Sequence, residues 1–262
     1  MIVIKYGGHA LPEFGASDPV LELIAREYRN GRELVLTHGG GPQINAALTK
    51  LGIAKEMVGG YRRTTTEVFQ VVQEVLSGQV LRTIVNSLIG LGVDAVGLSA
   101  ADGSLIRAEK MTVDVAGVPT DIGLVGDISE TNATILKAVL SLKKLPVVSP
   151  IGVSTTGQGL NLNADLVAGA IGGAMKAECV LFMTDVPGIY RNWPDASSLI
   201  ETISATDLAE LAPTFAEGMA PKVKAALSAL SNGAQSVRII DGRDAANLAS
   251  AFAGMGGTLV TA

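Results

Sequence analysis

The sequence predicts an α/β protein, with an open and mostly parallel sheet sandwiched by helices and two lobes that share one continuous central sheet. Short β-branched runs alternate with helical patterns, which is typical of parallel sheets covered on both faces. No linker rich in proline, serine or charge separates two halves, so the sheet itself must join the lobes. The strand candidates are residues 2–6, 33–37, 94–98, 146–149, 178–183 and 236–240.

Helix candidates lie between these strands, and several repeat apolar residues near the helical period of about 3.6. One segment breaks the alternation, because residues 104–127 contain short extended pieces separated by Gly117-Val118-Pro119 and by Gly123. This pattern predicts an antiparallel insertion that forms a lid. The helix candidates are residues 19–30, 42–51, 65–91, 132–142, 164–177 and 219–232.

Composition restricts the class of protein. A chain of 262 residues with 48% hydrophobic and 17% charged residues is long and apolar enough for a large core, which excludes disorder. A net charge of −5 offers no basic surface for nucleic acid. Mean hydropathy is +0.39, but the longest apolar stretch, residues 166–175, is too short to span a bilayer. With a single cysteine and no signal-peptide features, we expect a cytoplasmic protein with small-molecule ligands and neither nucleic acid nor membrane as partner.

The first chemical motif is Lys5-Tyr6-Gly7-Gly8-His9, at the carboxyl end of the opening strand. Ligands bind at this edge of open parallel sheets, and glycines there allow backbone N–H groups to approach a phosphate. Lys5 adds a positive charge beside them. Taken alone, the motif is also compatible with a tight turn and a solvated lysine.

The second motif, Thr37-His38-Gly39-Gly40-Gly41-Pro42, again joins a strand end to a helix. Three glycines before a helix amino terminus favour an anion site over a simple turn, which needs only one. We expect His38 to be a structural hydrogen-bonding residue rather than an acid or base. The chain has neither a Walker sequence nor a complete dinucleotide fingerprint after its first strand, so a different nucleotide scaffold is required.

Four further motifs follow these two in order along the chain, and together they cover nearly all of it. They are Gly60-Tyr61-Arg62, Leu160-Asn161-Leu162-Asn163-Ala164-Asp165, Thr184-Asp185-Val186-Pro187-Gly188-Ile189-Tyr190 and Gly218-Met219-Ala220-Pro221-Lys222. With them the sequence resembles the acetylglutamate kinases of the wider amino-acid kinase family. The glycine motifs and two lysines are shared by the wider family, whereas the arginine and asparagine elements point to acetylglutamate kinases.

The resemblance implies ATP-dependent phosphorylation of the side-chain carboxylate of N-acetyl-L-glutamate, in arginine biosynthesis. It implies an acceptor and dimerisation lobe at residues 1–174, an ATP-binding lobe at residues 175–262, and Mg²⁺ carried by the nucleotide without protein ligands. Lys5 and Lys222 would stabilise the transferred phosphoryl group, and Asp165 would hold both lysines in place. Because the acceptor carboxylate is already ionised, no catalytic base is expected.

The same resemblance assigns the binding residues. Gly40, Gly41, Arg62, Asn161 and Asn163 would bind the acceptor, and Gly7, Gly8 and Gly39 the phosphoryl group. The nucleotide pocket would be lined by Thr184, Asp185, Val186, Pro187, Gly188, Ile189, Tyr190, Thr214, Phe215, Ala216, Gly218 and Met219.

Several of these residues have ordinary alternatives. Arg62 and Arg63 form a basic pair of the kind usually solvated, the two asparagines suit a turn and a helix cap, and Lys222 suits an exposed helix. Arg63 also departs from the family, which commonly has an aliphatic residue there; this leaves open which guanidinium reaches the substrate. We expect Arg62 to bind and Arg63 to meet solvent or an acidic neighbour.

Two other functions remain open: a kinase for a related carboxylate, such as an aminoadipate derivative in lysine biosynthesis, and a non-catalytic nucleotide-binding regulatory module. An isopentenyl phosphate kinase is disfavoured, because its Ser-Phe-Gly-His element is missing after the glycine motif. We expect a homodimer joined through the acceptor lobes, at the central sheet or helix 65–91. Arginine-inhibited relatives carry an extra helix before the first strand, which here begins at Ile2, so we expect activity indifferent to arginine.

Overall fold

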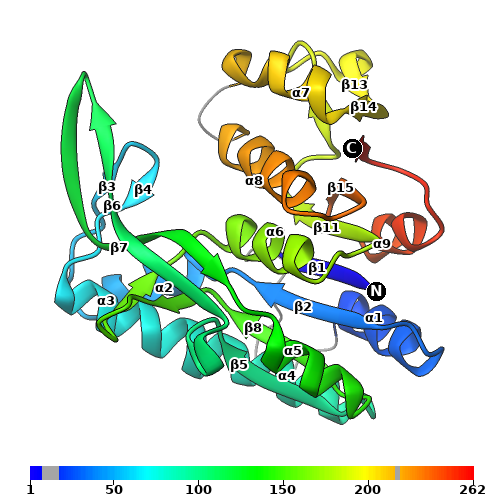
Figure 1. The fold of residues 1–262 in the computed structure, drawn as a ribbon, viewed down its shortest axis with the longest axis horizontal. Helices are drawn as coiled ribbons and strands as arrows, with labels where there is room; N and C mark the ends of the chain where they lie inside the picture. The colour runs from blue at the N-terminus through cyan, green and yellow to red at the C-terminus, as the bar shows by residue number, and fades with distance from the viewer. Residues whose placement is uncertain (8–17, 216–218) are drawn as a thin grey trace.

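The computed structural model describes residues 1–7, 18–215 and 219–262 (Figure 1). Its central sheet contains β1 (Ile2–Tyr6), β2 (Leu34–His38), β5 (Ala95–Ser99), β8 (Leu145–Ser149), β11 (Cys179–Thr184), β14 (Thr202–Ser204), β15 (Ser236–Asp241) and β16 (Thr258–Thr261). The order is β14-β16-β15-β11-β1-β2-β8-β5, and each neighbouring pair is parallel except β15 with β16. The open, mostly parallel α/β sheet predicted from the sequence is therefore confirmed.

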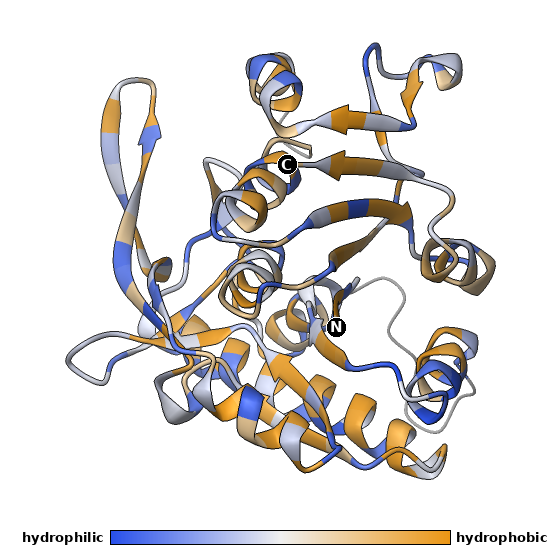
Figure 2. Cartoon of the chain, turned by 45° about the vertical axis from the view of Figure 1, so that its right-hand side comes forward, coloured by the Kyte–Doolittle hydropathy of each residue, from blue (hydrophilic) through white to orange (hydrophobic). Residues whose placement is uncertain are grey.

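Helices cover both faces of this sheet and enclose two hydrophobic cores. Side chains of β1 alternate between them, with Ile2, Ile4 and Tyr6 in one core and Val3 in the other, as the two-residue period of a strand requires. The sheet strands are mostly apolar along their length (Figure 2), as expected where both faces are buried. The first core is covered by α1 (Pro19–Arg29), α2 (Gly41–Lys50), α3 (Thr66–Gln73), α4 (Leu81–Gly90) and α9 (Ala245–Phe252); the second by α5 (Thr134–Ser141), α6 (Ala164–Ala174), α7 (Ala205–Leu211) and α8 (Ala220–Ser231).

The helix predicted over residues 65–91 is one helical segment of three parts. Between α3 and α4 lies a π-helical turn, η1 (Glu74–Val80), that the sequence pattern did not predict. It packs on the second glycine motif, since a Cβ added at Gly40 would lie 2.6 Å from Leu76 Cδ2. Wider turns of this kind occur often at functional sites.

The predicted antiparallel insertion is present as a long hairpin of β6 (Ile106–Val115) and β7 (Val118–Thr131), which projects from the body of the molecule (Figure 1). Its strands are longer than the short pieces that the sequence indicates. Of the predicted break Gly117-Val118-Pro119, only Gly117 lies in the turn, and Gly123 lies within β7. At the base, β9 (Ile151–Val153) and β10 (Gly159–Asn161) close a four-stranded ring with the hairpin.

Some elements were not predicted. They include the outer strand β14 and its neighbour β16, helices α7 and α9, and the two-residue strands β3 (Met57–Val58), β4 (Tyr61–Arg62), β12 (Ile189–Tyr190) and β13 (Leu199–Ile200). Strands this short show no measurable alternation of apolar and polar residues. Over the residues that the structure describes, no helix combines the length and apolar character needed to cross a membrane.

Candidate active site

A cavity of about 250 Å³ lies where the carboxyl ends of β1, β2, β11 and β15 meet. This is the edge of an open parallel sheet at which ligands bind. Loops from both halves of the chain contribute to its wall. The lining residues are Lys5, Gly7, Gly39, Gly40, Gly41, Pro42, Met183, Thr184, Asp185, Lys222, Gly242 and Arg243.

Both lysines of the predicted catalytic set pair with Asp165 at this cavity. Lys5 Nζ lies 2.9 Å from Asp165 Oδ1, and Lys222 Nζ lies 3.5 Å from Asp165 Oδ2. The carboxylate is buried, and burial alone would raise its pKa. The charges and hydrogen bonds of the two ammonium groups outweigh burial and hold the pKa of Asp165 below its ordinary value. The site thus contains a carboxylate anion between two cations.

The start of α6 fixes the position of Asp165. Asn163 is the N-cap residue, and its Oδ1 accepts hydrogen bonds from the backbone N–H groups of Asp165 (2.8 Å) and Leu166 (3.1 Å). The side-chain oxygen of Asn163 therefore caps the helix, which is the ordinary role considered for this residue from the sequence. Asp165 follows in the first turn, with its carboxylate directed to the lysines.

The glycine motifs bring backbone close to the cavity. A Cβ at Gly7 would lie 2.9 Å from Met183 O, so a side chain there would separate β1 from β11. A Cβ at Gly41 would have no neighbour within 4 Å, and this residue opens α2 with no side-chain cap at Gly40. Helix N–H groups therefore remain available to an anion. Gly8, expected with Gly7 and Gly39 to bind the phosphoryl group, lies outside the described residues.

His38 is buried at the end of β2, where its Nδ1 donates a hydrogen bond to Gly39 O at 2.9 Å. Burial lowers the imidazole pKa to about 4, against a smaller opposing effect of that hydrogen bond. The ring is therefore neutral at physiological pH and holds the glycine loop in place. This agrees with the structural role expected for it.

The two neighbouring arginines differ in environment. Arg62 is half-buried at the end of β4 and its Nη2 donates to Asn45 Oδ1 at 2.5 Å. Its Nη1 is buried and has no hydrogen-bond partner among the described residues, and burial lowers the guanidinium pKa. Arg63 is exposed and pairs with Glu56 at 2.9 Å, as anticipated. A half-buried cation whose free donor is buried is suited to an anionic ligand.

Asn161, at the end of β10, is half-buried and donates from Nδ2 to Thr64 Oγ1 at 3.3 Å. Neither Arg62 nor Asn161 lines the 250 Å³ cavity. The two residues are instead connected to each other through Thr64. Neither Thr64 nor Asn45 was identified from the sequence, since a lone threonine or asparagine carries no chemical signature.

The residues expected to bind the nucleotide lie in several environments. Thr184 and Asp185 line the cavity, whereas Ile189 is fully buried, with its backbone N–H bonded to Thr258 Oγ1 at 2.8 Å. Tyr190 packs edge-on against Trp193. Val186, Pro187, Gly188, Thr214, Phe215 and Met219 are described but do not line the cavity, and Ala216 and Gly218 lie outside the described residues.

The cavity also contains residues that the sequence analysis missed, chiefly Gly242 and Arg243. Arg243 Nε lies 2.9 Å from Asp241 Oδ1, and hydrogen bonds from Arg243 lower the pKa of Asp241. A signal was present, because Asp241-Gly242-Arg243 ends a predicted strand in the same way as the other glycine loops.

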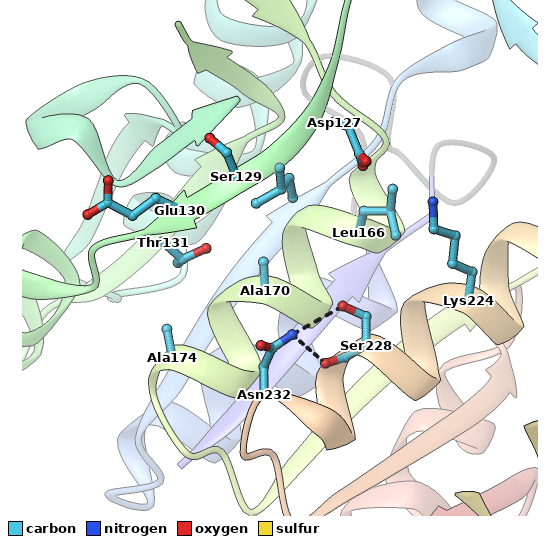
Figure 3. A pocket seen from close by; sticks show the side chains of 11 residues that line it. Asp127, Ser129, Glu130, Thr131, Leu166, Ala170, Ala174, Lys224, Ser228 and Asn232 are labelled. Carbon is cyan, nitrogen blue, oxygen red and sulfur yellow. Dashed lines mark hydrogen bonds between the residues drawn. The ribbon is translucent and has the colours of Figure 1, made fainter. Parts of the chain in front are cut away.

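A larger cavity, of about 470 Å³, lies between β7, α6 and α8 (Figure 3). Its charged residues are Asp127, Glu130 and Lys224, and Asn232 is bonded to Ser228 within the same helix turn. No residue of the predicted site lines it. The choice between the two cavities therefore rests on the convergence of cations and glycine loops rather than on volume.

Comparison with known proteins places the chain in a family. Residues 1–241 match the model of the amino acid kinase family. The acetylglutamate kinase of Mycolicibacterium gilvum is 45% identical over 93% of this chain and 84% of its own length; that of Corynebacterium glutamicum (strain ATCC 13032) is 41% identical over 98% and 87%. The N-acetylglutamate synthase of Neisseria gonorrhoeae, solved with coenzyme A and N-acetyl-glutamate, superposes with a TM-score of 0.82 at 26% identity, over the whole of this chain and 59% of the synthase. This chain belongs to the amino acid kinase family.

Proposed function

We propose that this protein uses ATP to phosphorylate the side-chain carboxylate of N-acetyl-L-glutamate, giving N-acetyl-L-glutamyl 5-phosphate in arginine biosynthesis. The observation that carries the proposal is the cluster of Lys5, Asp165 and Lys222 beside the glycine loops. The choice of acceptor is supported by relatives named acetylglutamate kinase at 41 to 45% identity over more than nine-tenths of the chain.

The acceptor needs no activation by a base. A glutamate-type carboxylate has a pKa of about 4.3 and is ionised at neutral pH. One of its oxygens forms the new bond to the γ-phosphorus of ATP while the bond from that phosphorus to the β-γ bridging oxygen breaks, leaving ADP. The obstacle is the repulsion between two anions, so the protein must provide positive charge at the transferred group.

Lys5 and Lys222 provide that charge from opposite sides of Asp165. Each ammonium keeps donors beyond its contact with the carboxylate, and these would bind the oxygens of the transferred phosphoryl group. Backbone N–H groups near Gly7, Gly39, Gly40 and Gly41 would complete the anion site, with Gly8 expected beside them. Asp165 would hold the two lysines at fixed positions and take no proton.

Arg62 and Asn161 would bind the acceptor away from the reacting atoms. The unpaired Nη1 of Arg62 would meet its α-carboxylate, for which a guanidinium is well shaped. Asn161 would hydrogen-bond the same molecule, and Asn163, whose oxygen caps α6, would contribute only its amide N–H groups. Gly40 and Gly41 would hold the reacting end.

We assign residues 1–174 to the acceptor lobe and residues 175–262 to the nucleotide lobe. The assignment is supported by the sheet, since β1, β2, β5 and β8 come from the first range and β11, β14, β15 and β16 from the second. The nucleotide would lie along residues 184–190 and 214–219. We expect Mg²⁺ to arrive with ATP and to be bound mainly by its phosphates and by water, as this ion commonly is at nucleotide sites.

We also propose a homodimer joined through the acceptor lobes. The support is the outer position of β5 in the sheet and the exposed Ile89 at the adjoining end of α4. Light scattering in solution tests the proposal, and a monomer at micromolar concentration would overturn it.

Phosphoryl transfer itself is tested by measuring ADP release with acetylglutamate, glutamate, aspartate and aminoadipate derivatives in parallel. We expect acetylglutamate to be used with the highest kcat/KM, and the acyl phosphate formed to be trapped by hydroxylamine. Preference for an aminoadipate derivative would support the alternative kinase. Binding of ATP without turnover on any acceptor would instead indicate a regulatory module.

A further inference from the structure

One hydroxyl group contacts both of the residues assigned to the non-reacting part of the acceptor. Thr64 Oγ1 donates a hydrogen bond to Arg62 O at 2.8 Å and accepts one from Asn161 Nδ2 at 3.3 Å. Arg62 and Asn161 belong to different strands, β4 and β10, which do not pair with each other. Thr64 thus provides a direct polar connection between them.

Thr64 is itself held firmly. Its side chain is fully buried, its N–H donates to Ile122 O at 2.8 Å, and its carbonyl accepts from Leu124 N at 2.6 Å. These bonds place it against Gly123 of β7, which has a φ of +80°. A Cβ at Gly123 would lie 2.1 Å from Thr64 O, so only glycine permits this approach. The threonine is therefore anchored to the projecting hairpin, and the positions of Arg62 and Asn161 follow from it.

The guanidinium of Arg62 is fixed at its other end by Asn45, which accepts from Nη2. With the backbone held by Thr64 and the head by Asn45, the remaining buried donor, Nη1, has a defined direction. Asn161 has one N–H occupied by Thr64 and keeps the rest of its amide for a ligand. The arrangement provides a guanidinium and an amide preset for one small molecule.

We propose that Thr64 is a positioning residue for the acceptor: its hydroxyl holds Arg62 and Asn161 in the mutual geometry that binds the non-reacting end of the carboxylate substrate. This inference rests on the proposed function. Loss of the hydroxyl would leave the Arg62 carbonyl and an Asn161 N–H without their partner, and would release the amide to rotate. Because Thr64 does not line the cavity that contains the two lysines, we expect chemistry and ATP binding to be little affected.

The test compares Thr64→Val, which keeps the shape and removes the hydroxyl, with Thr64→Ser, which keeps the hydroxyl. We expect Thr64→Val to raise the KM for acetylglutamate about ten-fold, with kcat and the KM for ATP within about two-fold of wild type, while Thr64→Ser stays near wild type. In an Asn161→Ala background, Thr64→Val should have a smaller effect than alone, because the two act together.

An unchanged KM for acetylglutamate in Thr64→Val would overturn the inference, as would equal damage in Thr64→Ser, which would indicate a packing role. Should Thr64→Val fail to fold, Thr64→Cys, similar in size with a weaker hydrogen-bonding group, is judged by the same criteria. Wild-type protein that binds ATP yet shows no acetylglutamate-dependent ADP release would overturn the proposed function and this inference with it. Normal wild-type turnover with an insensitive Thr64→Val overturns the inference alone.

Discussion

The Lys5 ammonium lies 2.9 Å from the Asp165 carboxylate, although one comes from the first strand and the other from the start of the sixth helix. Only about a tenth of each side chain is accessible to solvent. Lys222 lies at the other oxygen of Asp165, so the cluster combines two ammonium groups with one carboxylate. It therefore carries an excess of positive charge, which faces a cavity. A buried excess charge is costly unless an anionic ligand offsets it, which is what a phosphoryl-transfer site requires.

Replacing either lysine should mainly slow turnover. We expect Lys5→Ala and Lys222→Ala each to lower kcat by about 100- to 1,000-fold with smaller changes in both KM values, because the charge acts on the transition state. Lys224→Ala is the matched control, since Lys224 lies on the same helix, is exposed and lines the other cavity. Near-normal turnover in either test variant, or an equal loss in the control, would refute the mechanism.

The variant Asp165→Asn removes the charge of the carboxylate and keeps the size of the side chain, so it tests the charge alone. The amide is the same size but no longer fixes two ammonium groups, so we expect turnover to fall about 100-fold in a protein that remains folded by circular dichroism. In wild type the lowered pKa of Asp165 adds stability above the ordinary aspartate pKa and loses it as pH falls through the lower folded value. Acid unfolding below about pH 4 should therefore be less steep in the variant. An active Asp165→Asn enzyme would exclude the organising role.

The fold was largely predictable because its strands are buried on both faces. Successive residues such as Val3 and Ile4 are both apolar because each packs in a core on its own face of the sheet. Each predicted strand lies within about one residue of its observed bounds. Strands β12, β13, β14 and β16 were missed, since they are only two to four residues long. The π-helical turn at residues 74–80 was missed because its apolar spacing resembles that of an α-helix.

The candidate site was predictable where it follows the general rule that ligands bind at the carboxyl ends of parallel strands. The glycine loops after β1 and β2 and the lysines follow from strand ends and from family resemblance, and Arg243 would have followed from the same rule applied to β15. Thr64 and Asn45 could not be predicted in this way. Their roles depend on hydrogen bonds between segments far apart in sequence, such as Asn161 to Thr64, which only the folded chain defines.

Arg62 and Arg63 offer a direct comparison of neighbouring residues. Arg62→Lys keeps the charge but loses the planar fork and its bond to Asn45, so we expect the KM for acetylglutamate to rise at least about ten-fold while the KM for ATP is unchanged. Arg63→Lys is the control, because its exposed pair with Glu56 contributes little. A larger effect of Arg63→Lys in steady-state kinetics would transfer the substrate contact to Arg63.

His38 should make the protein sensitive to mild acid. Its pKa is about 4 in the folded protein against 6.5 as the ordinary value, because burial disfavours the charged ring. The unfolded chain therefore binds the proton more readily, and stability that is fully present above pH 6.5 is lost as pH falls towards 4, amounting to roughly 3 kcal/mol in the free energy of unfolding. In His38→Asn, which cannot titrate, urea unfolding between pH 7 and pH 4 should lack this component, although the variant starts from lower stability. Equal pH slopes in the variant and the wild type would show that folding does not lower the pKa of His38, and a buried ring that stays neutral in mild acid would then be the wrong description of this residue.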